Sequence, residues 1–468
     1  MKILYIGSGY VGACSAAVSA DSGHQVLVYD INQELVKKMS ARDKDIIESA
    51  LFEEGLGELI IRNKERLKFT DNLDDLKEFL DQAEAIFLCL PTPEKDETGE
   101  TDLSYYEIAV RDLTKVLKIR NENSQSQYVL LINKSTVPIE MINRTREILE
   151  QAEVKNFSVG ANPEFLVEGK AIEGSIRPQR IVVGASNEKD FQIFRNIYQR
   201  FCDSPNVEYI EVNPAEAAAG KLLANYFLFN RLANCFDVVG RACETFNDLN
   251  FENVKKILIT DKRIGDWGFY NSLYAGGSCL IKDARSLAYQ LKEKEVEAEL
   301  IDNIISANKR QLATFLRRPE AELDYSWEGK TVGLLGLAFK RHTNDIRNSA
   351  AIYITKYLIK NGVKLITAYD PTAGKNFRSY FKEETEKIKV VKHESEAIDK
   401  MNAIIIITDW PQFRELDIII KNNLTRGCLI MDGRRILRHK YEELSQAGYN
   451  IIAVGSPVIK AKDEGLGT

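Results

Sequence analysis

The chain opens with Lys2-Ile3-Leu4-Tyr5-Ile6-Gly7-Ser8-Gly9-Tyr10-Val11-Gly12, and this stretch decides the fold of its first part. The run Lys2–Ile6 predicts a strand, and the stretch from Ala13 to Asp21 predicts a helix. Between a strand and a helix, a first glycine makes the tight turn, a second lets a pyrophosphate approach the backbone, and a third allows close helix–strand packing. The stretch therefore predicts an α/β domain that binds a dinucleotide at Gly7, Gly9, Tyr10, Val11 and Gly12.

An acidic residue follows the second predicted strand of this domain. The strand is Gln25–Tyr29, and Asp30 stands at its end. A carboxylate at this point can bond the hydroxyls of a ribose and repels a 2′-phosphate. We therefore expect NAD rather than NADP as the cofactor. The alternative is a glycine turn that binds no ligand.

Further short apolar runs alternate with stretches that predict helices, which is typical of a parallel sheet covered by helices. Additional strands are predicted at Ala85–Cys89, Tyr128–Asn133 and Arg180–Val183. The sequence from Asn213 to Glu244 is rich in alanine and leucine and predicts one long helix, which could serve as the spine of a dimer. A second helix is predicted from Glu295 to Leu316.

A second α/β unit follows what we interpret as a linker, Arg317–Trp327. Its predicted strands are Thr331–Leu335, Val363–Tyr369, Ala403–Thr408 and Cys428–Asp432. The polar tail from Lys460 to Thr468 is expected to fray. The fold class is therefore α/β, with two doubly wound Rossmann-like domains joined by a long central helix and a helical dimerisation segment. We place the domains at 1–205, 206–318 and 319–468.

The composition excludes several classes of protein. A chain of 468 residues is too long for one core, and its net charge of -6 argues against a nucleic-acid-binding surface. No apolar run is long enough to cross a membrane, and the chain enters a strand at once, so we expect no signal peptide. The seven cysteines are odd in number and lack metal-binding spacing. These features predict a reduced, cytoplasmic protein without a metal site.

The sequence around one of these cysteines favours a reactive thiol. Cys279 follows Gly276 and Gly277 and precedes Lys282 and Asp283. Two glycines allow a substrate to approach closely, and a thiol near cationic groups can be a nucleophilic thiolate. With a nicotinamide cofactor, such a thiol suggests the oxidation of an alcohol through an aldehyde, held as a thioester, to an acid. The alternative is a small buried apolar residue.

Polar residues also stand at two strand ends and in the long helix. Thr92 lies in Leu90-Pro91-Thr92-Pro93, and Thr136 lies in Lys134-Ser135-Thr136-Val137-Pro138; both could equally be helix caps in proline-set turns. Lys221 and Asn225 lie four residues apart in the long helix, so their side chains share one face. The apolar neighbours indicate a mostly buried helix. A buried lysine is rare and costly, so Lys221 is a candidate for a functional role.

Taken together, these segments resemble the nucleotide-sugar 6-dehydrogenases over nearly the whole chain. The matching motifs run in order: GSGYVG, CLPTP, KSTVP, ANPEFLVEG, the segment from Lys221 to Asn225, DKRIG, GGSCLIKD, GLAFKRHTNDIRNS, YDP, ITDW and DGRR. The resemblance implies three domains, a homodimer joined through the central helix, and two rounds of NAD reduction for each sugar.

The resemblance also implies roles for individual residues. Cys279 would attack the C6 aldehyde of the sugar to give a thiohemiacetal, which becomes a thioester when it loses hydride. Lys221 and Asn225 would cradle the reacting oxygen, and Asp283 would order a water for the chemical steps. Glu164 would help to hydrolyse the thioester, with Thr136 positioning the water.

The remaining contacts implied by the resemblance concern cofactor and substrate. The cofactor contacts are Gly7, Gly9, Tyr10, Val11, Gly12, Asp30, Thr92, Thr136, Glu168 and Arg347. The substrate contacts are Glu164, Phe165, Leu166, Lys221, Asn225, Arg263, Gly276, Lys340 and Arg434. In the family, the counterpart of Arg263 often reaches into the site of the neighbouring subunit, which would make the site depend on the dimer. Each of these cations could instead be a solvated surface charge.

The sequence departs from the family pattern at several points. Phe236-Asp237 stands where the family usually has Asn-Glu, Ile281 replaces a common proline, and Val167 replaces a frequent arginine. None of these changes removes a proposed catalytic group, but they leave the sugar open between UDP-glucose, GDP-mannose and UDP-N-acetylmannosamine. The DKRIG and ITDW segments favour UDP-glucose.

Two other classes of function remain open at this point. A two-electron 3-hydroxyacid dehydrogenase of similar topology would need no thiol and would yield one NADH for each substrate. A catalytically silent protein that binds NAD or senses sugar nucleotides would bind without turnover. The intact set of thiol, lysine, asparagine and aspartate argues against the silent protein.

Overall fold

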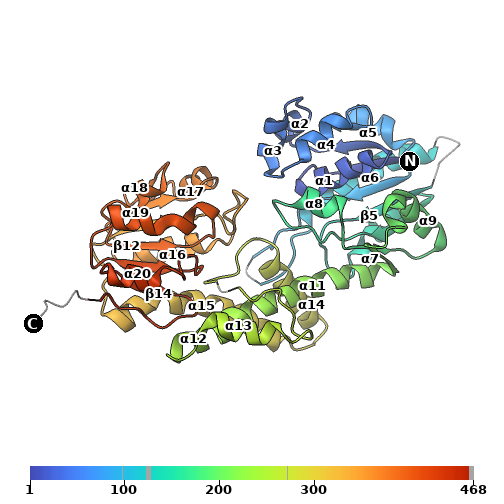
Figure 1. Ribbon diagram of the computed structural model, residues 1–468. Helices are drawn as coiled ribbons and strands as arrows, with labels where there is room; N and C mark the ends of the chain where they lie inside the picture. The colour runs from blue at the N-terminus through green and yellow to red at the C-terminus, as the bar shows by residue number, and fades with distance from the viewer. Residues whose placement is uncertain (97, 123–127, 271, 463–468) are drawn as a thin grey trace, which may run out of the picture. The chain divides into compact units, whose positions relative to one another are not determined.

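The computed structural model describes residues 1–96, 98–122, 128–270 and 272–462. Contacts within the chain group it into two compact units, whose elements are labelled in Figure 1. The first unit comprises Met1–Ala224 with Ser286–Val296, and the second comprises Asn225–Arg285 with Glu297–Thr468. The division into 1–205, 206–318 and 319–468 remains a prediction. Most of the tail that we expected to fray lies outside the described residues.

The first unit is built on an eight-stranded sheet in the order β3-β2-β1-β4-β5-β6-β7-β8. Neighbouring strands from β1 to β6 pair in parallel, and their order is that of a doubly wound nucleotide-binding sheet. The strands are β1 (Lys2–Ile6), β2 (Gln25–Tyr29), β3 (Leu67–Thr70), β4 (Ala85–Leu88), β5 (Val129–Asn133), β6 (Phe157–Ala161), β7 (Arg180–Gly184) and β8 (Glu208–Val212). The five predicted strands are confirmed, with ends that agree to within one residue.

Helices cover both faces of this sheet. They are α1 (Tyr10–Asp21), α2 (Gln33–Met39), α3 (Lys44–Leu51), α4 (Leu56–Arg62), α5 (Leu73–Leu80), α6 (Ser104–Glu122), α7 (Met141–Gln151), α8 (Ala171–Ile176), α9 (Glu188–Ile197) and α10 (Gln199–Cys202). Side chains alternate along each strand, so Ile3 and Tyr5 pack in one core with α1, α4 and α8, whereas Leu4 and Ile6 pack in the other with α5, α6 and α7. The C-terminal ends of the parallel strands are left open for a ligand.

The strand β7 joins the sheet in an unusual way. It pairs with β6 in the antiparallel sense through Ala161 and Gly184, which are the last residues of the two strands. Because antiparallel strands that meet at their last residues run past each other, the earlier part of β7 lies beside the chain that follows β6. Two side chains confirm this: Asn162 Nδ2 donates to the carbonyl of Val182 (2.8 Å), and Arg180 Cζ lies 4.0 Å from the centre of the Phe165 ring.

The second unit contains a six-stranded parallel sheet in the order β11-β10-β9-β12-β13-β14. Its strands are β9 (Thr331–Leu335), β10 (Leu365–Tyr369), β11 (Ile388–Val390), β12 (Ala403–Ile406), β13 (Leu429–Asp432) and β14 (Asn450–Ala453). Its helices include α16 (Ala350–Lys360), α17 (Gly374–Tyr380), α18 (Glu394–Ile398), the 3₁₀ turn η2 (Pro411–Glu415), α19 (Leu416–Asn423) and α20 (Tyr441–Gln446). The four strands predicted here are confirmed, although three of them are shorter than predicted.

Helices connect the two sheets in the sequence. They are α11 (Pro214–Asn234), the π-helical turn η1 (Cys235–Gly240), α12 (Arg241–Thr245), α13 (Phe251–Ile259), α14 (Leu280–Glu293) and α15 (Glu299–Leu323). The predicted long helix is confirmed as the continuous run from α11 through α12. The predicted linker is wrong over its first part, because α15 continues to Leu323 despite Pro319. Arg318 Nε donates to Glu322 Oε1 one turn later (2.7 Å), and such a pair supports a helix.

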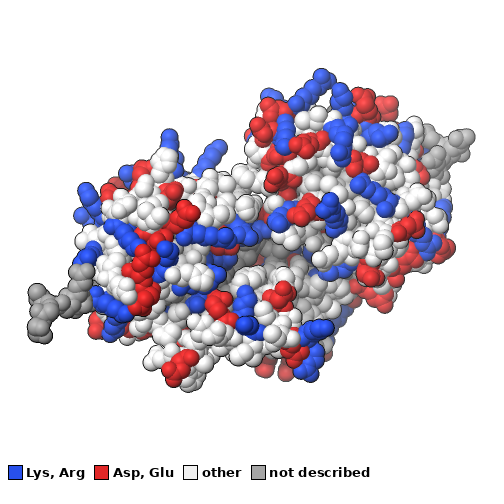
Figure 2. Space-filling view, in the orientation of Figure 1, with Lys and Arg blue, Asp and Glu red and all other residues white. Residues whose placement is uncertain are grey.

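Charged side chains of both signs are interspersed over the visible face of each unit (Figure 2). A nucleic-acid-binding protein typically presents a continuous basic stripe instead. No helix in the described part of the chain is both long and apolar enough to cross a membrane. The architecture is thus two Rossmann-like sheets with a long helix between them in the sequence.

Candidate active site

The glycine-rich turn after β1 meets both the packing and the ligand requirements of a dinucleotide site. Gly7 has a φ of +100°, and a Cβ there would lie 2.3 Å from the carbonyl oxygen of Cys89. A Cβ at Gly12 would lie 2.0 Å from the carbonyl oxygen of Gly7. At Gly9, by contrast, a Cβ would meet no protein atom within 4 Å, so packing does not require this glycine. The open space above Gly9 fits the close approach of a pyrophosphate.

Asp30 lies against the same turn. Its Oδ2 accepts hydrogen bonds from the backbone N–H (2.6 Å) and the hydroxyl (2.8 Å) of Ser8, and its Oδ1 accepts one from the N–H of Asn32 (2.8 Å). The helix α1 begins with Tyr10 and Val11, and no side chain caps its N-terminus at Gly9. The uncapped N–H groups favour the negative charge of a phosphate. The glycine-rich turn and Asp30, which are expected to hold NAD, therefore lie together at one end of β1 and β2, whereas Arg347 belongs to the second unit.

The loops that follow β4 and β5 are tied to each other. Thr92 Oγ1 donates to the carbonyl of Thr136 (2.8 Å), and the Ser135 hydroxyl bonds to the backbone of Leu90 (2.7 Å). Thr136 and Lys221 line one small cavity of about 240 Å³. The structure thus places Thr92, Thr136 and Lys221 at the same edge of the first sheet.

Glu164 and Lys221 form a buried ion pair. Their Oε1 and Nζ atoms lie 3.1 Å apart, and only 9% and 6% of the two side chains is exposed. Glu164 Oε2 also accepts the N–H of Leu166 (2.5 Å), and Lys221 Nζ lies 5.3 Å from the centre of the Phe165 ring. A buried ion pair is costly to desolvate, which makes it a candidate for chemistry rather than for stability. The sequence suggested the two residues separately, but it contained no signal that they pair.

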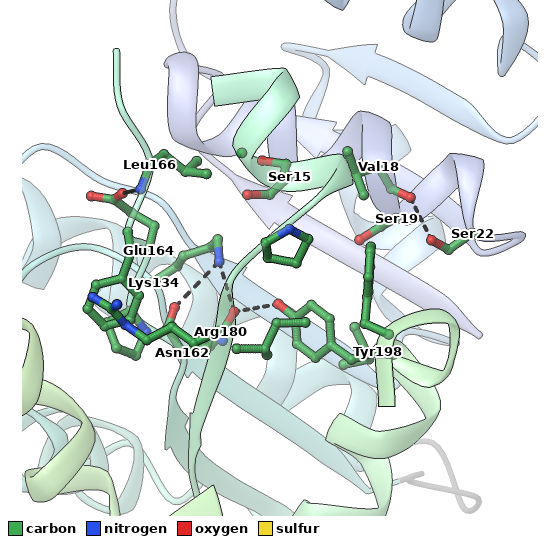
Figure 3. Close-up of a pocket in the computed structure, with 18 of the residues that line it drawn as sticks. Ser15, Val18, Ser19, Ser22, Lys134, Asn162, Glu164, Leu166, Arg180 and Tyr198 are labelled. Atoms are coloured by element: carbon green, nitrogen blue, oxygen red, sulfur yellow. Dashed lines mark hydrogen bonds between the residues drawn. The ribbon is translucent and has the colours of Figure 1, made fainter. Parts of the chain in front are cut away.

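A pocket lies beside this ion pair, between α1 and the segment after β6 (Figure 3). It holds about 610 Å³ of empty space, part of it open to solvent. Glu164 and Leu166 line it, together with Lys134, Asn162 and Tyr198. Lys134 and Asn162 stand in motifs of the sequence but were given no role, and their contact could not be predicted because they follow different strands.

In the second unit, Cys279 stands apart from the other cysteines because it is exposed. It directly precedes α14, and a helix N-terminus stabilises negative charge such as that of a thiolate. Burial raises the pKa of the remaining six thiols, that of Cys89 and Cys235 to about 12. Those six are Cys14, Cys89, Cys202, Cys235, Cys243 and Cys428, and they remain protonated at neutral pH.

The turn before Cys279 has no room for side chains. A Cβ at Gly276 would lie 2.6 Å from the carbonyl oxygen of Asn348. Gly277 has a φ of +87°, and a Cβ there would lie 2.8 Å from the Phe339 ring. The N–H of Gly277 donates to the carbonyl of Arg347 (3.2 Å). The two glycines therefore hold the thiol on the segment that follows β9.

Asn225 and Asp283 are in direct contact in this unit. Asn225 Nδ2 donates to Asp283 Oδ2 (2.5 Å), and the other carboxylate oxygen lies 2.8 Å from Lys282 Nζ. The Asp283 side chain is only 1% exposed. Its backbone N–H donates to the carbonyl of Cys279 (2.9 Å), which fixes the carboxylate one turn from the thiol.

The remaining predicted cations have different surroundings. Arg434 is mostly buried, and it donates to Ser272 Oγ (2.7 Å) and to Asp409 Oδ1 (2.9 Å). Lys340 Nζ lies 5.5 Å from the centre of the Phe339 ring, and Arg347 pairs with Asp345 (2.7 Å). Arg263 is 89% exposed and pairs with Asp261 (2.6 Å), while Glu168 is half-buried in the first unit. Among the described residues, no cluster of three His, Cys, Asp or Glu could hold a metal ion.

Comparisons with known proteins agree over the whole chain. Three domain descriptions of the UDP-glucose/GDP-mannose dehydrogenase family match it: the NAD binding domain at residues 1–202, the central domain at 215–310 and the UDP binding domain at 333–439. A UDP-glucose 6-dehydrogenase of Rickettsia bellii is 32% identical over 461 residues, which cover 98% of this chain and 100% of that one. One from Pseudomonas aeruginosa is 29% identical over 467 residues, which cover 98% of each chain.

Solved structures give the same picture. A UDP-glucose dehydrogenase from Pyrobaculum islandicum superimposes with a TM-score of 0.84 at 26% identity, and the match covers 97% of both chains. A UDP-N-acetylmannosamine dehydrogenase from Pyrococcus horikoshii superimposes with a TM-score of 0.80 at 23% identity, covering 97% of this chain and 99% of that one. The second likeness bears on the fold alone.

Proposed function

Since this chain belongs to the UDP-glucose/GDP-mannose dehydrogenase family and is an NAD-dependent nucleotide-sugar dehydrogenase, we propose that it oxidises UDP-glucose to UDP-glucuronate in a four-electron reaction. The observation that carries the proposal is the exposure of Cys279 at the N-terminus of α14, while the other six cysteines are shielded. A simple two-electron dehydrogenase has no use for such a thiol. UDP-glucose is favoured because the curated relatives in this comparison are named for it.

We assign residues of this chain to the two oxidation steps. A water held by Asp283 takes the proton of the C6 hydroxyl as a first hydride leaves C6, and Lys221 stabilises the oxygen as charge develops on it. The thiolate of Cys279 adds to the C6 aldehyde that results, and the adduct is a thiohemiacetal. Loss of a second hydride converts this adduct into a thioester. Bound NAD supplies the hydride acceptor in both oxidations, and Gly7, Gly9, Gly12 and Asp30 are the residues that hold it.

The last step is the hydrolysis of the thioester. Water adds to the acyl carbon, the C–S bond breaks, and the products are the acid and the free thiol of Cys279. We assign the activation of this water to Glu164, whose carboxylate is buried and oriented by Lys221 and the N–H of Leu166. The diphosphate of the substrate is assigned to Lys340 and Arg434. The homodimer implied by the family resemblance and the cytoplasmic location predicted from the sequence form part of the same proposal.

The stoichiometry of an exhaustive reaction tests the proposal. Purified protein with limiting UDP-glucose and excess NAD should release two NADH for each sugar and form an acid. One NADH for each sugar would refute the four-electron reaction and the role of Cys279. An absence of NADH with UDP-glucose, followed by two NADH with GDP-mannose or UDP-N-acetylmannosamine, would move the assignment to that sugar.

A further inference from the structure

Lys134 is a buried cation that the reaction above does not use. It directly follows β5, and only 6% of its surface is exposed. Its Nζ donates to Asn162 Oδ1 (2.8 Å) and lies 5.8 Å from the centre of the Phe87 ring (Figure 3). In the described part of the chain, no carboxylate forms an ion pair with it. An ammonium group in such a place is expensive, so packing alone does not account for a lysine here.

The partner of Lys134 is the residue that starts the segment carrying Glu164. Asn162 Oδ1 accepts hydrogen bonds from Lys134 and from the hydroxyl of Tyr198 (2.5 Å), and its Nδ2 donates to the carbonyl of Val182 (2.8 Å). Its backbone N–H donates to the carbonyl of Asn133 (2.9 Å). Both polar atoms of the amide are therefore used, and Lys134 fixes which of them faces β5.

The other end of the same segment is held by a buried anion. Glu53 is 1% exposed, and its two carboxylate oxygens accept the N–H groups of Gly169 (2.7 Å) and Ala171 (2.8 Å) at the start of α8. The chain from Asn162 to Ala171 is thus held at its first residue by Lys134 and at its last residues by Glu53. Lys221 and the N–H of Leu166 hold the Glu164 carboxylate, and Lys134, through Asn162, holds the backbone two residues before Glu164.

We infer that Lys134 is a positioning residue: through Asn162 it fixes the segment that carries Glu164 and thereby sets the rate at which the thioester is hydrolysed. The catalytic part of this inference rests on the proposed function, whereas the positioning part does not. Burial lowers the pKa of Lys134, and the nearby Glu164 carboxylate opposes that shift. The charge of Lys134 is therefore favoured by the group whose position it controls.

Amide hydrogen exchange of the full-length Lys134→Met protein tests the positioning. Methionine fills nearly the same volume but cannot donate to Asn162. We expect the amides from 164 to 168, including that of Leu166, to exchange about tenfold faster or more, while those of β1 keep their protection. Unchanged exchange in this segment would overturn the inference.

Arg120→Met is the matched control. Arg120 is a buried cation of the same unit, 3% exposed, and donates to the carbonyls of Leu80 (2.9 Å) and Ala83 (3.0 Å). We expect it to lower stability without loosening residues 163–168. If Arg120→Met accelerated exchange in this segment as much as Lys134→Met does, the effect would reflect general destabilisation and the inference would be wrong. If Lys134→Met does not fold, Lys134→Leu, which also cannot donate to Asn162, takes its place in every measurement.

Turnover of UDP-glucose tests the catalytic consequence. A displaced Glu164 should lower kcat about 10- to 100-fold and change KM less, because the diphosphate contacts assigned to Lys340 and Arg434 are kept. Intact-mass spectrometry during turnover should then reveal the sugar nucleotide covalently attached at Cys279, since the thioester forms faster than it is hydrolysed. Loosened exchange with normal kcat, or slow turnover without the adduct, would overturn the catalytic part. If the unaltered protein oxidised no nucleotide sugar, the proposed function would fail, and the exchange comparison would still decide the positioning.

Discussion

Gly9 and Gly12 belong to one turn, but alanine should have different effects at the two positions. Gly12→Ala should lower the stability of the free protein, whereas Gly9→Ala should weaken the binding of NADH. At Gly12 the new methyl group would lie 2.0 Å from the carbonyl oxygen of Gly7, far inside contact distance. Overpacking of this kind costs about 1–3 kcal/mol, which corresponds to a fall of about 4–8 °C in Tm for a unit of this size if the cost is about 2 kcal/mol. The free protein should therefore be clearly less stable.

At Gly9 the methyl group would meet no protein atom within 4 Å, and the φ of -60° suits any residue. Alanine is less favourable than glycine at a helix N-cap by less than about 1 kcal/mol, so we expect the Tm of the free protein to fall by at most about 3 °C, less than for Gly12→Ala. The same methyl group occupies the space that the pyrophosphate needs. We expect the Kd for NADH to rise about tenfold or more, which equals about 1.4 kcal/mol.

Thermal unfolding with and without NADH separates the two effects. At a concentration 100 times its Kd, NADH stabilises the unaltered protein by about 2.7 kcal/mol, and Gly9→Ala should lose about half of this gain. Fluorescence titration with NADH gives the Kd directly. The reasoning is refuted if Gly9→Ala destabilises the free protein as much as Gly12→Ala does, or if Gly9→Ala binds NADH as tightly as the unaltered protein.

Three further outcomes are expected. Iodoacetamide at neutral pH should label Cys279 first among the seven cysteines and abolish acid formation, as Cys279→Ala should; peptide mapping that found another cysteine labelled first would contradict the assignment of the exposed Cys279 as the reactive thiol. Asp30→Ser should raise kcat/KM with NADP about 10- to 100-fold by removing a like charge, and steady-state kinetics with no gain would show that Asp30 does not face the ribose. Burial raises the pKa of the Glu244 carboxyl above its usual 4.5, so the folded protein binds the carboxyl proton more tightly than the unfolded protein does. The contribution of Glu244 to the free energy of unfolding therefore falls as pH rises from 4.5 through the raised pKa. Glu244→Gln should remove this fall in the free energy of unfolding, which is about 1.4 kcal/mol for each pH unit between 4.5 and the raised pKa. If urea unfolding of the variant from about pH 4.5 to 7 still showed the full fall, Glu244 would not be its source.

Local patterns made most of the fold predictable. The strand β1 and the glycines after it are consecutive in the sequence, and their requirements are steric, so Gly7 and Gly12 could be interpreted correctly without the structure. Strands with polar residues at inward or edge positions, such as β3, β6 and β8, were missed because their alternation is weak. The linker was predicted to begin too early, because α15 continues through Pro319, where the burial of Phe315, Leu316 and Pro319 supplies tertiary packing that no local pattern shows.

The candidate site was predictable as a set of residues but not as a set of contacts. Lys221 could be singled out because a lysine in an apolar helix is unusual. Its ion pair with Glu164 joins residues 57 positions apart and depends on how α11 packs on the sheet. Lys134 and Glu53 gave no signal of their own, because a buried charge looks like any other charge in a sequence until the surrounding atoms are known.

The junction between β6 and β7 leaves room for change in the course of evolution. Most strands of the first sheet are locked to their neighbours over four or five residue pairs, so an insertion within them would turn inward side chains outward. Only Ala161 and Gly184 pair at this junction, and side chains such as Asn162 and Arg180 bridge the rest. Residues can therefore be gained or lost in the turn at 177–179, between α8 and β7, without re-registering β1 to β6, whereas the stretch from 162 to 176 keeps its length because Lys134, Glu53 and the core packing of α8 fix it.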